Sequence, residues 1–91
     1  MKQLKNPCNG WRSRETWNIS LWINNDEPLY RSAVEFVKNH KGHAIYRNFI
    51  YFSNLSDKMT PDGIDWLSNK VCYSELNSMM RELYNRIESA F

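Results

Sequence analysis

The chain has few of the residues that interrupt regular structure or cross-link it. Its 91 residues include only 3 glycines, 3 prolines and 2 cysteines. So little glycine and proline argues against a turn-rich β-sandwich and against a disordered linker. The cysteines, Cys8 and Cys72, follow no apolar signal segment, and this favours the reducing cytoplasm over an exported, disulfide-bonded protein.

Neither sign of charge is in large excess. The chain has 12 basic and 10 acidic residues, a net charge of +2, which excludes a DNA mimic and falls short of a dedicated nucleic-acid module. No apolar run approaches the roughly 18 residues of a membrane span. The first 14 residues carry basic side chains and no acid: Lys2, Lys5, Arg12 and Arg14. We expect residues 1–12 to form an irregular basic arm and residues 13–91 a single helical domain.

Aromatic residues, by contrast, are abundant and clustered. They make up 14% of the chain, and three of the four tryptophans, Trp11, Trp17 and Trp22, fall within twelve positions. Large rings at this density form either a core or a binding surface. Trp17, Leu21 and Trp22 fit one helix face, which favours the core without deciding between the two. If one of the three rings is exposed, we expect it to be Trp11.

Capping signals predict the first two helices. Ser13 is expected to cap a helix that begins at Arg14, although the alternating pattern of residues 17–23 also fits a strand. Asp26, followed by a proline in the first turn, predicts the start of a second helix. That helix carries an apolar stripe and should end near residues 41–42, where a lysine precedes a glycine.

Three further helices follow from the remaining pattern. Residues 44–52 predict a helix with positions 45, 49 and 52 on its inner face, a buried strand being the alternative. Thr60-Pro61-Asp62 is a strong start signal for a short helix, and Ser74 is expected to cap a last helix with a Leu76, Met80, Leu83 stripe. The predicted fold is therefore an all-α domain of four or five short helices around an aromatic core.

Signs of catalysis or metal binding are weak. Cys8 and Cys72 could act with His40 or His43 as nucleophile and base or as zinc ligands. Zinc ligands normally include a close cysteine pair, however, and no nucleophile signature surrounds either thiol. Phosphate-loop, dinucleotide-binding and nucleophile-elbow motifs are absent from the sequence. We predict a protein that is not an enzyme and that has no cofactor or metal.

The segment from Gly10 to Tyr30 carries a resemblance. It is similar to a signature, G-W-x-x-x-E-T-W-N-x-x-L-W-x-x-N-D-E-x-L-Y, of small uncharacterised proteins encoded by bacteriophages, plasmids and cyanobacteria. The matching residues are Gly10, Trp11, Glu15, Thr16, Trp17, Asn18, Leu21, Trp22, Asn25, Asp26, Glu27, Leu29 and Tyr30. The later TPDG followed by Asp65-Trp66 resembles a second part of that pattern. The resemblance implies a small accessory protein of a mobile element, working in the cytoplasm of a bacterial host cell.

Proteins of that kind commonly bind and block a host protein complex. The leading hypothesis is therefore a phage-type viral protein that inhibits a bacterial defence complex, of the anti-CRISPR or anti-restriction type. The expected contact residues for the protein partner are Trp11, Arg12, Arg14, Asn25 and Asp26.

Two other functions remain open. A small nucleic-acid-binding protein would use the basic arm or the basic run at residues 38–47, through Lys2, Lys5, Lys38, Lys41 and Arg47. A homodimer through the methionine-containing face of the last helix, at Met79 and Met80, is the third possibility.

Overall fold

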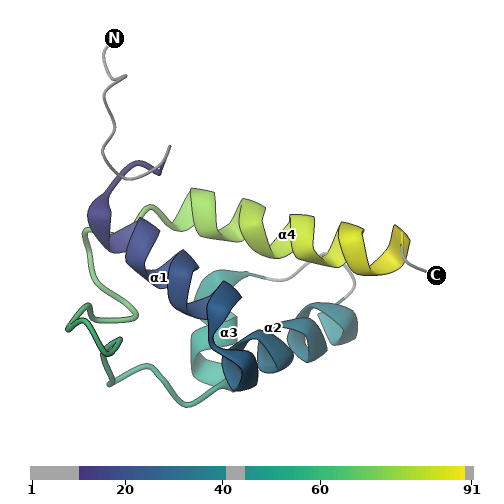
Figure 1. Cartoon of the computed structure of the whole chain (residues 1–91), viewed down its shortest axis with the longest axis horizontal. Helices are drawn as coiled ribbons and strands as arrows, with labels where there is room; N and C mark the ends of the chain where they lie inside the picture. The colour runs from purple at the N-terminus through teal and green to yellow at the C-terminus, as the bar shows by residue number, and fades with distance from the viewer. Residues whose placement is uncertain (1–10, 41–44, 90–91) are drawn as a thin grey trace, which may run out of the picture.

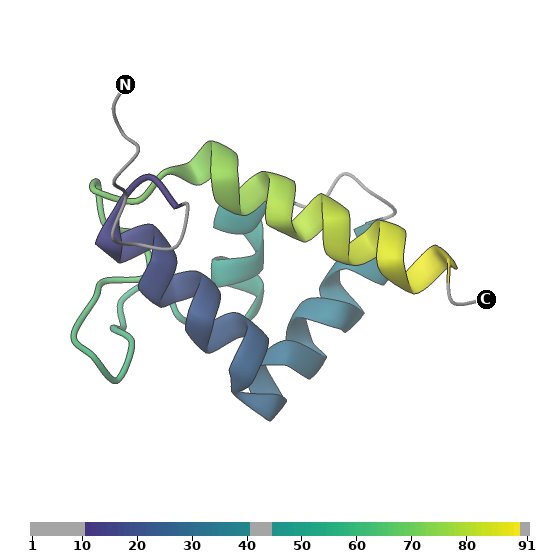
Figure 2. The ribbon, with the colours of Figure 1, turned by 45° about the horizontal axis from the view of Figure 1, so that its top comes forward.

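The fold is a four-helix domain without a sheet in the part of the chain that the structure describes. The computed structural model describes residues 11–40 and 45–89. It contains α1 (Arg14–Asn25), α2 (Glu27–His40), α3 (Tyr46–Phe52) and α4 (Tyr73–Ser89). In Figure 2, α1 and α2 form the arms of a V, α3 lies in its opening, and α4 crosses the open end (Figures 1 and 2). The all-α prediction is confirmed.

One residue, Asp26, joins the first two helices. Its backbone N–H donates to the Trp22 carbonyl at 3.0 Å and so ends α1. Its carboxylate accepts the Leu29 N–H at 3.2 Å and so caps α2. At the other end of α1, the Ser13 hydroxyl accepts the Thr16 N–H at 3.0 Å. Both predicted starts are confirmed, and residues 17–23 are helix, not strand; α2 ends at His40, and the predicted stop at residues 41–42 lies outside the described residues.

The buried face of α1 differs from the predicted one. Apart from Asn18, it consists of Thr16, Ile19, Ser20 and Ile23, which follow the spacing of one helix face. Of the face predicted for the core, Trp22 packs on the core cluster, whereas Leu21 is exposed and Trp17 is not among the described residues that pack on it.

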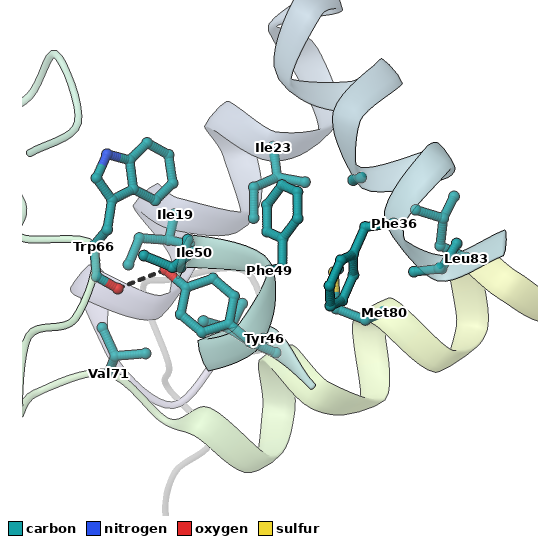
Figure 3. Packing of buried hydrophobic residues seen from close by; sticks show 13 residues of the cluster. Ile19, Ile23, Phe36, Tyr46, Phe49, Ile50, Trp66, Val71, Met80 and Leu83 are labelled. Atoms are coloured by element: carbon teal, nitrogen blue, oxygen red, sulfur yellow. Dashed lines mark hydrogen bonds between the residues drawn. The ribbon is translucent and has the colours of Figure 1, made fainter. Parts of the chain in front are cut away.

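α3 buries a different face from the one predicted. Its buried residues are Tyr46, Phe49 and Ile50, whereas Ile45 and Phe52 of the predicted face are 45% and 49% exposed. The Tyr46 hydroxyl donates to the Trp66 carbonyl at 2.6 Å, and the Phe36 and Phe49 rings lie 5.6 Å apart (Figure 3). The buried face of α3 is therefore displaced by about one residue from the predicted face, because this hydrogen bond and ring contact involve Tyr46 and Phe49.

The prediction of a short helix that begins at Thr60 is wrong. Residues 60–66 form turns, with an isolated antiparallel bridge between Met59 and Asp65. The Thr60 N–H donates to the Ile64 carbonyl at 2.7 Å, and the Thr60 carbonyl accepts the Gly63 N–H at 2.8 Å. Gly63 has φ +87°, a left-handed conformation that reverses the chain and stops a helix from continuing.

The last helix begins two residues earlier than predicted. α4 starts at Tyr73, and the Cys72 carbonyl accepts the N–H groups of Glu75 and Leu76 at 3.1 and 3.2 Å. Ser74 is thus inside the first turn and not the cap. The predicted stripe is confirmed, because Leu76, Met80 and Leu83 are all buried. Met80 fills the core and Met79 packs against it, so this face is already used within the chain.

Candidate functional site

The long connection between α3 and α4, residues 53–72, is fastened to side chains of α1. Near its end, the Ser13 hydroxyl donates to the Lys70 carbonyl at 2.9 Å. The Cys72 N–H donates to the Thr16 hydroxyl oxygen at 2.8 Å. In both views of the ribbon this connection runs beside α1 (Figures 1 and 2). The start of α1 therefore holds the chain just before it enters α4.

A second attachment joins the middle of the connection to α1. The Thr60 hydroxyl donates to Asn18 Oδ1 at 2.8 Å, and Asn18 Nδ2 donates to Asp62 Oδ2 at 2.7 Å. Trp22 Nε1 donates to the same carboxylate oxygen at 2.9 Å. We call Asn18, Trp22, Thr60 and Asp62 the Asp62 network. It joins the two motifs of the sequence resemblance, which lie about forty positions apart, and the sequence analysis did not detect it.

The Asp62 carboxylate is held in its charged form by this network. The hydrogen bond from Asn18 lowers its pKa most, that from Trp22 next, and the nearby Arg14 guanidinium lowers it further, while partial desolvation opposes them. Both donors converge on one oxygen, and Asn18 and Thr60 are 6% and 3% exposed. The role that the network supports is structural: it positions residues 60–66 against α1.

The face of α1 that points away from the domain carries a line of residues at helical spacing. They are Arg14, Trp17, Leu21 and Asn25, and we call them the outer stripe. Leu21 is 38% exposed, and Arg14 and Asn25 are exposed as well. Trp17 is half-buried, and unlike Trp11 and Trp22 it is not among the described side chains that pack on the core cluster. The outer stripe is thus apolar at its centre and polar at both ends.

The predicted contact residues lie at the two ends of this helix. Trp11 is half-buried and packs on the core, so it is not the most exposed part of the site. Arg12 is exposed, and its backbone N–H donates to Glu75 Oε1 at 2.9 Å. Asp26 serves as the cap of α2. The twelve residues of α1 place its ends about 18 Å apart, so the predicted residues do not form one cluster.

The residues that lie between these two ends, Trp17 and Leu21, are not among the predicted contact residues. Trp17 and Leu21 have large apolar side chains at helical spacing, which the sequence analysis assigned to the core. The signal that could have placed these two residues outside the core is the alternative face of α1. On that face, Ile19 and Ile23 supply the apolar groups and Thr16 and Ser20 the small ones.

Only some of the residues predicted to contact nucleic acid lie in the part of the chain that the structure describes. Lys2, Lys5 and Lys41 lie outside the described residues. Lys38 is exposed in the last turn of α2. The Arg47 guanidinium lies 4.6 Å from the centre of the Tyr73 ring, a cation–π contact.

One turn further along α3, Tyr51 is 56% exposed. Tyr73 itself is tied down, since its hydroxyl donates to the Ser68 carbonyl at 2.9 Å.

The described part of the chain shows neither a metal-binding cluster nor a membrane-spanning helix. Within residues 11–40 and 45–89, no three His, Cys, Asp or Glu side chains gather as a metal site would require. None of the helices in those ranges has the length and apolar character needed to cross a bilayer.

Comparison with known proteins places the chain in a family. The model of a family of unknown function (DUF7249) matches residues 4–88, and the chain belongs to that family. No curated protein and no solved structure matches the chain. The match covers the outer stripe, the Asp62 network, α1 to α3 and all of α4 except its last residue.

Proposed function

We propose that this member of the family acts by binding another protein through the outer stripe of α1. The observation that carries the proposal is the exposure of Leu21 beside Trp17 on a helix that already has a complete core face. A tryptophan beside an arginine is the composition of interface hot spots, and the exposed Leu21 adds apolar surface next to the half-buried Trp17. Neither side chain is needed to hold the connection 53–72, because the Asp62 network does that from the adjacent positions.

The partner that we propose is a bacterial defence complex, which the protein would bind and inhibit. This part rests on the resemblance to small proteins of bacteriophages and plasmids and on the size of the chain. A domain of this size can block a larger complex by occupying one contact surface, without chemistry of its own. The proposal accordingly assigns no catalytic residue and no cofactor.

The experiment compares phage plating on bacteria that carry an active CRISPR or restriction system. Expression of the protein should raise the plating efficiency, and the Leu21→Glu variant should abolish this effect. Asn85→Glu is the matched control, because it introduces the same side chain at an exposed position of α4. Circular dichroism of both variants should match the parent protein. Equal activity of Leu21→Glu and the parent would refute the assignment of the outer stripe.

A second candidate function, nucleic-acid binding, is favoured by the contact between Arg47 and Tyr73. An arginine stacked on a tyrosine, with Tyr51 exposed nearby, can stack an unpaired base. Binding to single-stranded oligonucleotides should then weaken steeply between 50 and 200 mM salt, about in proportion to the phosphates contacted. No binding at 50 mM salt, or binding that Arg47→Ala leaves unchanged, would remove this candidate.

A further inference from the structure

The tip of the connection, residues 57–66, exposes an apolar side chain that does not pack in the core. Met59 is 63% exposed, the largest value among the exposed large apolar residues of the described chain. Pro61 is also exposed, two positions later. Neither belongs to the core cluster or to the side chains that pack on it. An exposed methionine is common at surfaces that accommodate a protein partner.

The tip is held in a fixed shape. The Met59–Asp65 bridge and the hydrogen bond from the Trp66 N–H to the Lys58 carbonyl, at 3.3 Å, join its two sides. The Thr60 hydroxyl accepts the Ile64 N–H at 3.1 Å and so closes the turn from within. A segment that is already ordered loses little conformational entropy when it binds, so its apolar side chains contribute more to affinity than those of a flexible loop.

The Asp62 network places this tip beside the outer stripe. Asp62 bonds to Asn18 and Trp22, and these are the residues that directly follow Trp17 and Leu21 in α1. Successive residues of a helix point about 100° apart, so the side of α1 that holds the tip adjoins the side that forms the stripe. The tip and the stripe are thus neighbouring parts of one surface.

We propose that Met59 and Pro61 form, together with the outer stripe, a single surface for a single protein partner. This inference rests on the proposed function and adds to it the second element of the site and the charge pattern of the partner. The two elements come from distant parts of the sequence and are joined through Asp62.

The charges around this surface define the partner further. At the start of α1, Arg12 and Arg14 are exposed, and neither guanidinium forms an ion pair with a described residue. At the tip, Asp57 and Asp65 are exposed, and Lys58 contacts Asp57 at 3.8 Å. A complementary partner has an apolar groove with carboxylates near the arginines and basic groups near the aspartates. Nucleic acid fits this surface poorly, because its phosphates would meet the aspartates.

The test places a photo-crosslinking residue, benzoylphenylalanine, at position 21, 59 or 85 of the full chain. Each protein is expressed in the bacterial strain whose defence system the parent inhibits, and the cells are irradiated. Crosslinked products are identified by mass spectrometry, with and without nuclease treatment. We expect the same host protein from positions 21 and 59, resistant to nuclease, and no product from the control position 85, which lies on the exposed side of α4.

The partner identified in this way is then purified and used in a binding assay. We expect Met59→Ala to weaken binding about tenfold and Asp57→Lys to weaken it similarly; Asp57 is chosen because the Asp65 carboxylate accepts the Leu67 N–H at 2.9 Å and so also holds the connection. Asn85→Ala should leave binding unchanged. Unchanged affinity in the Met59→Ala and Asp57→Lys variants would overturn the inference even if the crosslinks agree.

The outcomes separate this inference from the proposed function. A product from position 21 but not from 59 would leave the proposed function intact and overturn the combined surface. No product from either position would overturn both. A second copy of the chain as the only product would overturn the assignment of a host partner, and a product removed by nuclease would do the same in favour of nucleic acid.

Discussion

The hydrogen bonds of the Asp62 network predict how much stability is lost when Thr60, which is 3% exposed, is replaced. Its hydroxyl makes two hydrogen bonds, donating to Asn18 Oδ1 at 2.8 Å and accepting from the Ile64 N–H at 3.1 Å. Thr60→Val replaces this hydroxyl by a methyl group of nearly the same shape. The variant therefore removes both bonds while it keeps the packing of the tip.

The magnitude follows from the two bonds and the groups they leave behind. Each neutral hydrogen bond contributes about 1 kcal/mol net, and a buried group left without a partner costs about 1–3 kcal/mol. Asn18 Oδ1 lies on a residue that is 6% exposed, so it falls in the second category. We expect Thr60→Val to lower the free energy of unfolding by about 2–3 kcal/mol. For a domain of this size the midpoint of thermal unfolding should fall by about 10–20 °C.

The assay is urea unfolding followed by tryptophan fluorescence, since Trp22 and the buried Trp66 report on the connection. Thr60→Ser is the matched control: it keeps both bonds and should lose only about 1 kcal/mol with its methyl group. The reasoning is refuted if Thr60→Val is as stable as the parent within about 0.5 kcal/mol, or if Thr60→Ser is the less stable of the two.

Five further predictions concern the core and the connection between α3 and α4. Tyr46→Phe should cost about 1–3 kcal/mol, because it leaves the Trp66 carbonyl without its donor, and urea unfolding measures it. Burial raises the pKa of Tyr46, so the parent should lose stability as pH rises above about 10, where only the unfolded chain ionises, and Tyr46→Phe should lose less in a pH series. Because the pKa of Asp62 is lowered, its contribution is present above about pH 4 and lost as pH falls through the folded pKa; Asp62→Asn should flatten that acid limb of the stability curve. Phe49→Ala, in the core, should cost about 3–5 kcal/mol in the same unfolding assay, whereas Gly63→Ala should cost about 1 kcal/mol through its positive φ alone, since no atom lies within 4 Å of the added methyl group.

Much of the fold was predictable because its helix ends are encoded locally. Ser13 and Asp26 have short oxygen-bearing side chains that can reach backbone N–H groups within their own segment, so the starts of α1 and α2 need no distant partner. The inner faces of α2 and α4 were predictable for a related reason. Each has one apolar stripe and an opposite polar side, so its periodicity has only one interpretation.

The remaining elements depend on contacts that local patterns do not contain. Thr60-Pro61-Asp62 has the composition of a helix start, yet the Thr60 hydroxyl donates to Asn18 and the Asp62 carboxylate accepts from Asn18 and Trp22. The Ile64 N–H that the Thr60 hydroxyl accepts closes a turn and does not start a helix. α3 has apolar residues on nearly every side, and only its contacts with Phe36 and Trp66 decide which of them are buried. In both cases long-range partners determine the conformation.

The candidate site was the least predictable part, because α1 has two faces that can each be buried. A face of Thr16, Ile19, Ser20 and Ile23 and a face of Trp17, Leu21 and Trp22 both have helical spacing, and the bulkier face suggests the core. The structure buries the smaller side chains, uses Trp22 to bind Asp62, and leaves Leu21 exposed beside Trp17. Within one helix, therefore, the side chains that face the connection stabilise the fold, while those that face outward are the ones that we propose bind a partner. A substitution at Asn18 or Trp22 should lower stability and binding together, and one at Leu21 should lower binding alone. Measuring both quantities on the same variants distinguishes a residue that holds the surface in place from one that contacts the partner.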